Sequence, residues 1–216
     1  MRKILTILFL AIIQFLNAQN YTEILGRPTD SSITMNILFD KAVNVYWEYG
    51  LTPSSYTMNT NVYTTIADTP IEVNFTNLLP NVKYYYRTRY KLIGNSNYIN
   101  GAEHYFQTQR KAGTSFRFMV EADPHLDSNT IEEAYRTSLR SMLLNRPDFL
   151  VDLGDNFMND KLPNPSREEI TKRNMLFRSF FNELNHSVPL YLTLGNHEGE
   201  VGFVNGVLDK IAKSAS

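Results

Sequence analysis

Cysteine is absent from the 216 residues, so the chain can form neither a disulfide framework nor a lipid-modified cysteine. An excess of charge is missing as well, because 21 Lys and Arg stand against 22 Asp and Glu, for a formal net charge of −1. The composition therefore gives no nucleic-acid-binding signature, no acidic tail and no sign of a disordered chain. Stability has to come from core packing or from a bound ligand.

Long apolar runs are also missing, apart from one at the start of the chain. Arg2 and Lys3 precede the apolar run 4–15, and the small residue Ala18 follows it. A run of about 12 residues is short of the roughly 20 that a membrane-spanning helix needs. The pattern predicts a signal peptide over residues 1–18, and hence an exported protein, periplasmic or secreted, with no transmembrane helix after cleavage.

The first half of the chain that follows has the pattern of short β-strands. Turn sequences rich in Pro, Gly and Asn separate runs that alternate between polar and apolar residues, at 32–39, 43–49, 71–75, 83–90 and 103–108. The high content of aromatic residues, 13 Tyr and 13 Phe, suits β-sheet. About seven short strands over about 90 residues predict an all-β sandwich at residues 20–110.

One turn within this half has a more specific pattern. Leu78 and Pro80 precede Tyr84. This spacing is similar to the tyrosine corner of fibronectin type III and immunoglobulin-like sandwiches, in which a Tyr hydroxyl ties a strand to the preceding turn. The alternative is an ordinary Tyr-rich strand, and the spacing favours the corner.

After a linker at residues 110–115, the pattern changes to strands alternating with helices. We expect strand 116–123, helix 129–145, strand 148–155, helix 167–184 and strand 188–196. Asn129 or Thr130 is expected to cap the first helix, and the second helix follows Pro165 and Ser166. This βαβαβ order predicts a parallel sheet with right-handed crossovers.

Each expected strand of this half ends in side chains that can bind a cation. The three ends are Asp123-Pro124-His125, Gly154-Asp155-Asn156 and Gly195-Asn196-His197-Glu198. The carboxyl ends of parallel strands form the ligand crevice of an open sheet, and this donor set suits Mn, Fe or Zn. Taken singly, each residue can equally be a turn, cap or surface residue. Their order at three strand ends is what predicts a metal site.

These three motifs, within ADPHLD, VDLGDNF and LTLGNHE, resemble the signature of the calcineurin-like metallophosphoesterase superfamily. That signature is Asp-x-His, then Gly-Asp, then Gly-Asn-His followed by Asp or Glu, each after a strand. The preceding sandwich resembles the N-terminal domain of purple acid phosphatases. The resemblance implies a two-domain chain, with an all-β, fibronectin III/Ig-like sandwich at 20–110 and the N-terminal half of an α/β, four-layer metallophosphoesterase domain at 116–216.

The resemblance also implies a reaction and roles for individual residues. The reaction is hydrolysis of a small-molecule phosphomonoester or phosphodiester, in which a hydroxide bound to two divalent metal ions (Mn, Fe or Zn) attacks phosphorus. The implied ligands are Asp123 and His125 for the first metal, Asp155 as the bridge and Asn196 for the second metal. His197 would lie over the phosphate and Glu198 would orient it.

The sequence departs from the pattern of purple acid phosphatases at two positions. Met158 stands where those enzymes have a Tyr ligand, and His125 stands where their first motif has Gly. A general metallophosphoesterase is therefore the better match.

The superfamily completes its metal pair with further His residues downstream, and this chain has no His after His197. We therefore expect a C-terminally truncated fragment whose second metal site is weak and whose catalysis is lost or incomplete. The alternative is an exported binding or adhesion module in which the sandwich is the working part and the phosphoesterase half is vestigial.

Overall fold

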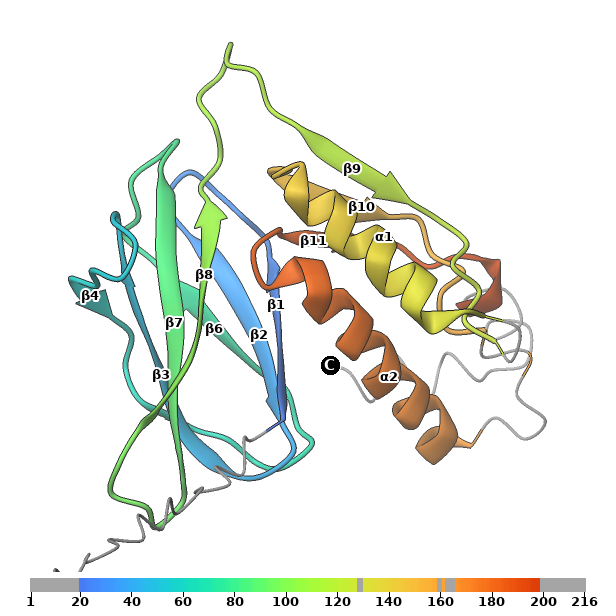
Figure 1. Ribbon diagram of the computed structural model, residues 1–216, viewed down its shortest axis with the longest axis horizontal. Coiled ribbons are helices and arrows are strands. Elements are labelled where there is room, and N and C mark those ends of the chain that lie inside the picture. Colours follow the sequence, from blue (N-terminus) through green and yellow to red (C-terminus); the bar gives the residue numbers. More distant parts are fainter. Residues whose placement is uncertain (1–19, 128–129, 159–160, 162–165, 199–216) are drawn as a thin grey trace, which may run out of the picture.

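A computed structural model describes residues 20–127, 130–158, 161 and 166–198 of the chain (Figure 1). The signal peptide expected at residues 1–18 lies outside the described residues. None of the described helices is long and apolar enough to cross a membrane.

The first part of the described chain is a β-sandwich. Its strands are β1 (Tyr21–Gly26), β2 (Ile33–Phe39), β3 (Val43–Gly50), β4 (Met58–Asn59), β5 (Tyr63–Thr64), β6 (Ile71–Phe75), β7 (Lys83–Leu92) and β8 (Ile99–Gln107). One sheet contains β6, β2 and β1, and the other has the order β4-β3-β7-β8, with β5 also paired to β3. Side chains along β3 alternate between buried and half-buried because successive residues of a strand point to opposite faces. The predicted all-β half is confirmed.

An aromatic core lies between these two sheets. It includes Trp47, Phe75, Tyr86 and Phe106, which are almost completely buried. The hydroxyl of Tyr84 accepts a hydrogen bond from the backbone N–H of Leu79 at 2.8 Å. This is the bond of a tyrosine corner, so the prediction made from the spacing of Leu78, Pro80 and Tyr84 is confirmed.

The second part of the described chain is an α/β layer. Its elements are β9 (Phe118–Glu121), α1 (Glu132–Leu144), β10 (Phe149–Asp152), α2 (Arg167–Asn185) and β11 (Leu190–Leu192). The middle strand β10 pairs in parallel with both β9 and β11, as the βαβαβ order predicted. Each strand is shorter than expected, and the motif residues therefore lie in the loops beyond the strand ends.

The two helices begin differently. The side chain of Ser166 accepts a hydrogen bond from the backbone N–H of Glu169 and so caps α2. The expectation of a Thr130 cap on α1 is wrong, because Ile131 occupies the N-cap position and no side chain caps this helix. The Thr130 hydroxyl instead donates to the carbonyl of His125 at 2.9 Å and accepts from the N–H of Asp127, so it stabilises the loop that carries His125. Asn129 lies outside the described residues.

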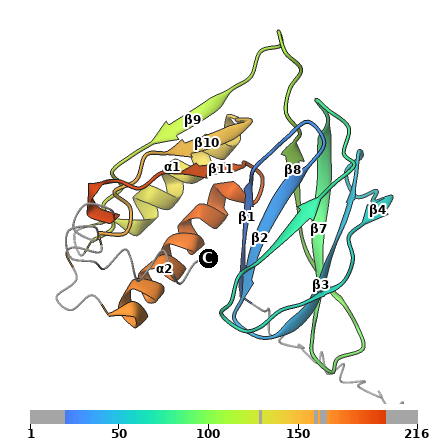
Figure 2. The ribbon, with the colours of Figure 1, turned by 180° about the vertical axis from the view of Figure 1, so that it is seen from behind.

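The two parts share one sheet. Strand β1 pairs in parallel with β11 through Gly26 and Leu190, and the sheet order becomes β6-β2-β1-β11-β10-β9. Helix α2 lies between α1 and the sandwich and packs on β1 (Figures 1 and 2). Each part keeps its own hydrophobic cluster, although Ile24 of β1 packs against the second one. The domain limits 20–110 and 116–216 stay a prediction.

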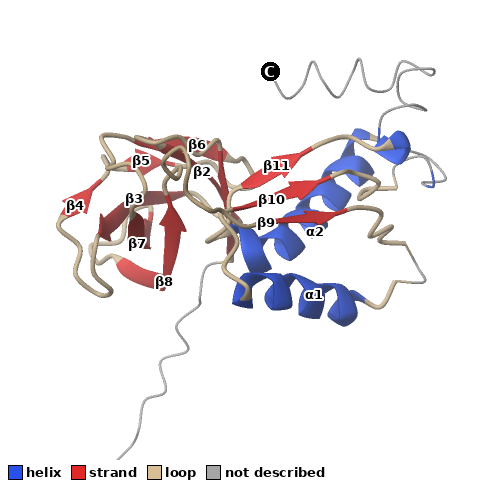
Figure 3. Ribbon diagram, turned by 90° about the horizontal axis from the view of Figure 1, so that it is seen from above, coloured by secondary structure: helices blue, strands red, loops and turns tan. Residues whose placement is uncertain are grey.

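Both α1 and α2 lie on the same face of β9, β10 and β11 (Figure 3). On these strands Phe118, Val120 and Tyr191 are exposed. The ring of Phe118 stacks on that of Phe149 with 5.4 Å between the centroids. An apolar aromatic surface is therefore left open among the described residues.

Candidate metal centre

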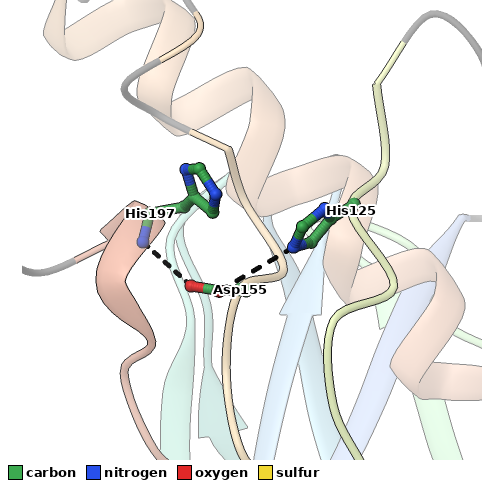
Figure 4. Close-up of side chains that lie close together, drawn as sticks. All are labelled: His125, Asp155 and His197. Atoms are coloured by element: carbon green, nitrogen blue, oxygen red, sulfur yellow. Dashed lines mark hydrogen bonds and ion pairs between the residues drawn. The ribbon is translucent and has the colours of Figure 1, made fainter.

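The loops that follow β9, β10 and β11 bring three metal-binding side chains together. His125 comes from the first loop, Asp155 from the second and His197 from the third (Figure 4). One potential ligand atom from each residue lies within 4.8 Å of the others. Three segments that are distant in the sequence therefore converge on one point, as the parallel strand order predicted.

The distances within this cluster suit a cation. The Nε2 atom of His125 lies 3.3 Å from a carboxylate oxygen of Asp123 and 3.8 Å from one of Asp155. That nitrogen is buried and has no hydrogen-bond partner among the described residues. The backbone N–H of His197 donates a hydrogen bond to the other carboxylate oxygen of Asp155 at 2.8 Å. The imidazole ring of His197 lies edge-on to that of His125, with 5.1 Å between the ring centroids. An unsatisfied imidazole nitrogen between two carboxylates is a donor set that a divalent metal ion fits.

The backbone of this site is strained. Asp123, His125 and Asp155 have φ angles of +57°, +44° and +58°, a region that side-chain-bearing residues seldom occupy. Backbone hydrogen bonds from Asp123 to the carbonyl of Gly154 and from His125 to that of Asp155 hold the first loop against the second. Each such residue costs about 1–3 kcal/mol and persists only where its surroundings fix it, as at functional sites.

Two glycines allow the second and third loops to touch. A Cβ atom on Gly154, which has φ +91°, would clash with the backbone of Gly195. A Cβ atom on Gly195 would clash with the backbone and carboxylate of Asp155. The glycine before each motif is therefore required by the close approach of the loops as well as by the turn itself.

Glu198 joins the same two loops. Its buried carboxylate accepts hydrogen bonds from the backbone N–H groups of Asp155 at 2.7 Å, Phe157 at 2.6 Å and Gly195 at 2.9 Å. The resemblance implied that Glu198 orients His197, and that role stays a prediction. The contacts with the amides of Asp155 and Phe157 were not expected, because these residues lie some 40 positions away in the sequence.

The remaining predicted ligands lie at the edge of the cluster. The side chain of Asp123 is 63% exposed, next to His125. Asn196 is exposed and begins the helical turn that also contains His197 and Glu198. The resemblance gave His197 a role other than metal binding, whereas its ring lies among the candidate ligand atoms. The division of ligands between two metals is therefore a proposal.

A pair of acids beneath the loops, one buried and one half-buried, was not predicted. Asp152 and Glu121 are partners in register on β10 and β9. Asp152 accepts from the N–H of Gly154 at 2.8 Å and from the side-chain amide of Asn156 at 2.6 Å, and so shapes the turn that carries Asp155. Burial, and then the charge of Asp152, raise the pKa of Glu121 to about 8, and the Tyr135 hydroxyl donates to its carboxyl. In the sequence, the available sign of this pair was Asp152 at the end of the otherwise apolar run FLVD.

The family comparison agrees with these motifs. Residues 116–214 match the family model described as calcineurin-like phosphoesterase. The α/β part of the chain therefore carries the pattern of that family. The resemblance to calcineurin-like metallophosphoesterases, predicted from the strand-end motifs, is confirmed. None of the curated proteins matches the chain.

One solved structure shares the fold over most of the chain. The structure of PhoD superposes with a TM-score of 0.59 and 17% identity, over 82% of this chain and 38% of the PhoD chain. The similarity thus includes both the sandwich and the α/β layer, and this chain spans well under half of PhoD. The sensor domain of the anti-sigma factor RsgI4 of Pseudobacteroides cellulosolvens is 10% identical, with a TM-score of 0.34, over 44% of this chain and 99% of that domain. At these identities the comparison with PhoD shows the fold alone.

Proposed function

We propose that this chain supplies part of a divalent-metal centre that hydrolyses small-molecule phosphomonoesters or phosphodiesters. The observation that carries the proposal is the convergence of His125, Asp155 and His197 from three strand-end loops within 4.8 Å. The match of residues 116–214 to the calcineurin-like phosphoesterases supports the same class of reaction.

Each residue of the centre has a proposed task. Asp123, His125 and Asp155 would hold one ion, and Asp155 with Asn196 would hold a second. Bound Mn, Fe or Zn ions would supply positive charge for the phosphoryl oxygens and lower the pKa of water. His197 would contact the phosphoryl group and protonate the leaving oxygen, and its backbone N–H bond to Asp155 fixes the distance between their loops.

Metal binding by the purified chain tests this proposal. We expect calorimetry to detect binding of Mn²⁺ or Zn²⁺, and Asp155→Asn to weaken it by roughly tenfold or more, as loss of a direct charged ligand should. Asp30→Asn, which changes an exposed carboxylate of the sandwich, is the matched control and should leave binding unchanged. Any hydrolysis of p-nitrophenyl phosphate by the chain should be abolished by chelators and by Asp155→Asn.

Two results would contradict the proposal. One is the absence of divalent-metal binding by the wild-type chain. The other is equal binding by wild type and Asp155→Asn, since the residue common to both proposed sites would then contribute nothing.

A further inference from the structure

A second candidate site lies where the sandwich meets the α/β layer. A cleft of about 490 Å³ is bounded by β1 and β2 on one side and by α2 and β11 on the other. This volume is in the range of small-molecule sites. None of the residues of the metal cluster lines the cleft, so it is a separate site.

The cleft contains a cation that lacks an acidic partner. The guanidinium of Arg178 donates to the hydroxyl oxygen of Thr22 at 3.1 Å and, over longer distances, to the backbone carbonyls of Thr22 and Asn36. No carboxylate of the described residues forms an ion pair with it. Burial lowers the pKa of Arg178 to about 10, and the side chain remains charged at neutral pH. A partly buried cation is stabilised when an anion neutralises it.

The other charges of the cleft cancel each other. Arg27 and Glu72 both line it, and their side chains form an ion pair. The lining therefore has one uncompensated positive charge, from Arg178. Most of the remaining wall is apolar and includes Ile24, Phe177, Phe181 and Leu190.

We infer that this cleft binds a small carboxylate with an apolar chain or ring. Its carboxylate would neutralise Arg178, and its apolar part would lie against Phe177 and Phe181. A single negative charge matches the single unpaired cation, whereas a phosphate dianion would bring a second charge close to Glu72. This binding is independent of metal at the His125 cluster.

Calorimetry with octanoate and 1-octanol tests the inference, because the two probes have the same chain length and differ in charge. We expect one octanoate per chain, with an affinity roughly tenfold or more above that of 1-octanol. Arg178→Met should remove that difference. Lys172→Met, at an exposed position of the same helix where the amine pairs with Glu168, should leave the affinity for octanoate unchanged.

Glu72→Gln provides a second variant in case Arg178→Met fails to fold. Glu72 is exposed on strand β6, and loss of its negative charge leaves Arg27 uncompensated. Octanoate should therefore bind roughly threefold to tenfold more tightly to this variant. Phe118→Ser, on the open aromatic face, should not change the affinity for octanoate. The inference would be overturned if the wild type bound the two probes equally or did not bind octanoate. It would also be overturned by unchanged octanoate binding in Arg178→Met, by unchanged or weaker binding in Glu72→Gln, or by loss of binding in Phe118→Ser.

Discussion

Single residues at the candidate metal centre are held in conformations that they would not adopt alone. Asp123, His125 and Asp155 have positive φ angles, and neighbouring groups must compensate for this strain. Glu198 contributes most visibly, because its carboxylate binds backbone amides of two loops at once. A residue that the resemblance placed in catalysis therefore also supports the shape of the site.

This support makes Glu198→Gln a test at the scale of one residue. The neutral amide has one acceptor oxygen in place of two charged ones, and its NH₂ group would face a backbone N–H. We expect the free energy of unfolding to fall by about 2–4 kcal/mol, since hydrogen bonds to charged groups contribute roughly 1.5–3 kcal/mol each. Urea denaturation measures the change.

Glu168→Gln is the matched control for this variant. Glu168 is exposed and pairs with Lys172 one helical turn away, and such an exposed pair contributes little to stability. If Glu198→Gln were as stable as Glu168→Gln, the amide contacts of Glu198 would not stabilise the two loops.

Among the elements, α2 links the α/β layer to the sandwich. Its buried side chains pack in the second cluster, with Phe177, Phe180 and Leu184 among them. Its flank faces the sandwich, where Asn182 accepts a hydrogen bond from the backbone N–H of Glu23. The end of α2 that begins at Arg167 follows residues 162–165, which lie outside the described residues. The side chain of Ser166 caps this end of α2 locally.

Ser166→Ala removes that cap. The N–H of Glu169 would lose its acceptor, and we expect the free energy of unfolding to fall by about 1 kcal/mol. Ser141→Ala on α1 is the matched control, because the Ser141 hydroxyl bonds only to a carbonyl within its own helix and Ala is the better helix former. Thermal denaturation should show a lower midpoint for the first variant and an equal or higher one for the second, and the reverse order would exclude a capping role.

At the scale of the whole molecule, a buried polar cluster joins the sandwich to the end of α2. Glu23 lies inside the sandwich and accepts hydrogen bonds from Trp47 and Thr88. His104 lies 3.6 Å from its carboxylate and stacks on His186, with 3.9 Å between the ring centroids. Burial raises the pKa of Glu23 to about 7 and lowers that of His104 to about 3 and that of His186 to about 4.

These shifts predict opposite effects of pH on stability. The folded state prefers protonated Glu23, so its contribution is complete below pH 4.5 and is lost as the pH rises through 7. The folded state prefers neutral imidazoles, so the contribution of His104 and His186 is present above pH 6.5 and is lost as the pH falls toward 4 and 3. The cluster should therefore be most stabilising near pH 6.5, where the His contribution is complete and that of Glu23 is not yet fully lost.

Glu23→Gln isolates the acidic member of the cluster. Between pH 5 and pH 8 the wild type should lose about 2–3 kcal/mol of stability relative to this variant, because one pKa unit corresponds to about 1.4 kcal/mol. Urea denaturation of both proteins at the two pH values measures the difference, and Glu72→Gln, at an exposed position of β6, is the control. A difference between wild type and Glu23→Gln that stays constant with pH would contradict the raised pKa.

The sequence by itself determined the order and type of the main elements, the tyrosine corner at Tyr84 and the candidate ligands at three strand ends. These features depend on hydrophobic periodicity and on short spacings, which are local. The sequence predicted the positions of the strands more accurately than their ends. Strand ends depend on contacts between loops, which hold Asp123 and Asp155 at positive φ angles.

Only the tertiary structure decided the features that join distant residues. They are the pairing of β1 with β11, the hydrogen bonds that the backbone amides of Asp155 and Phe157 donate to Glu198, and the cleft around Arg178. None of these has a local pattern, because the free energy of each contact depends on two segments that the fold brings together from far apart in the chain.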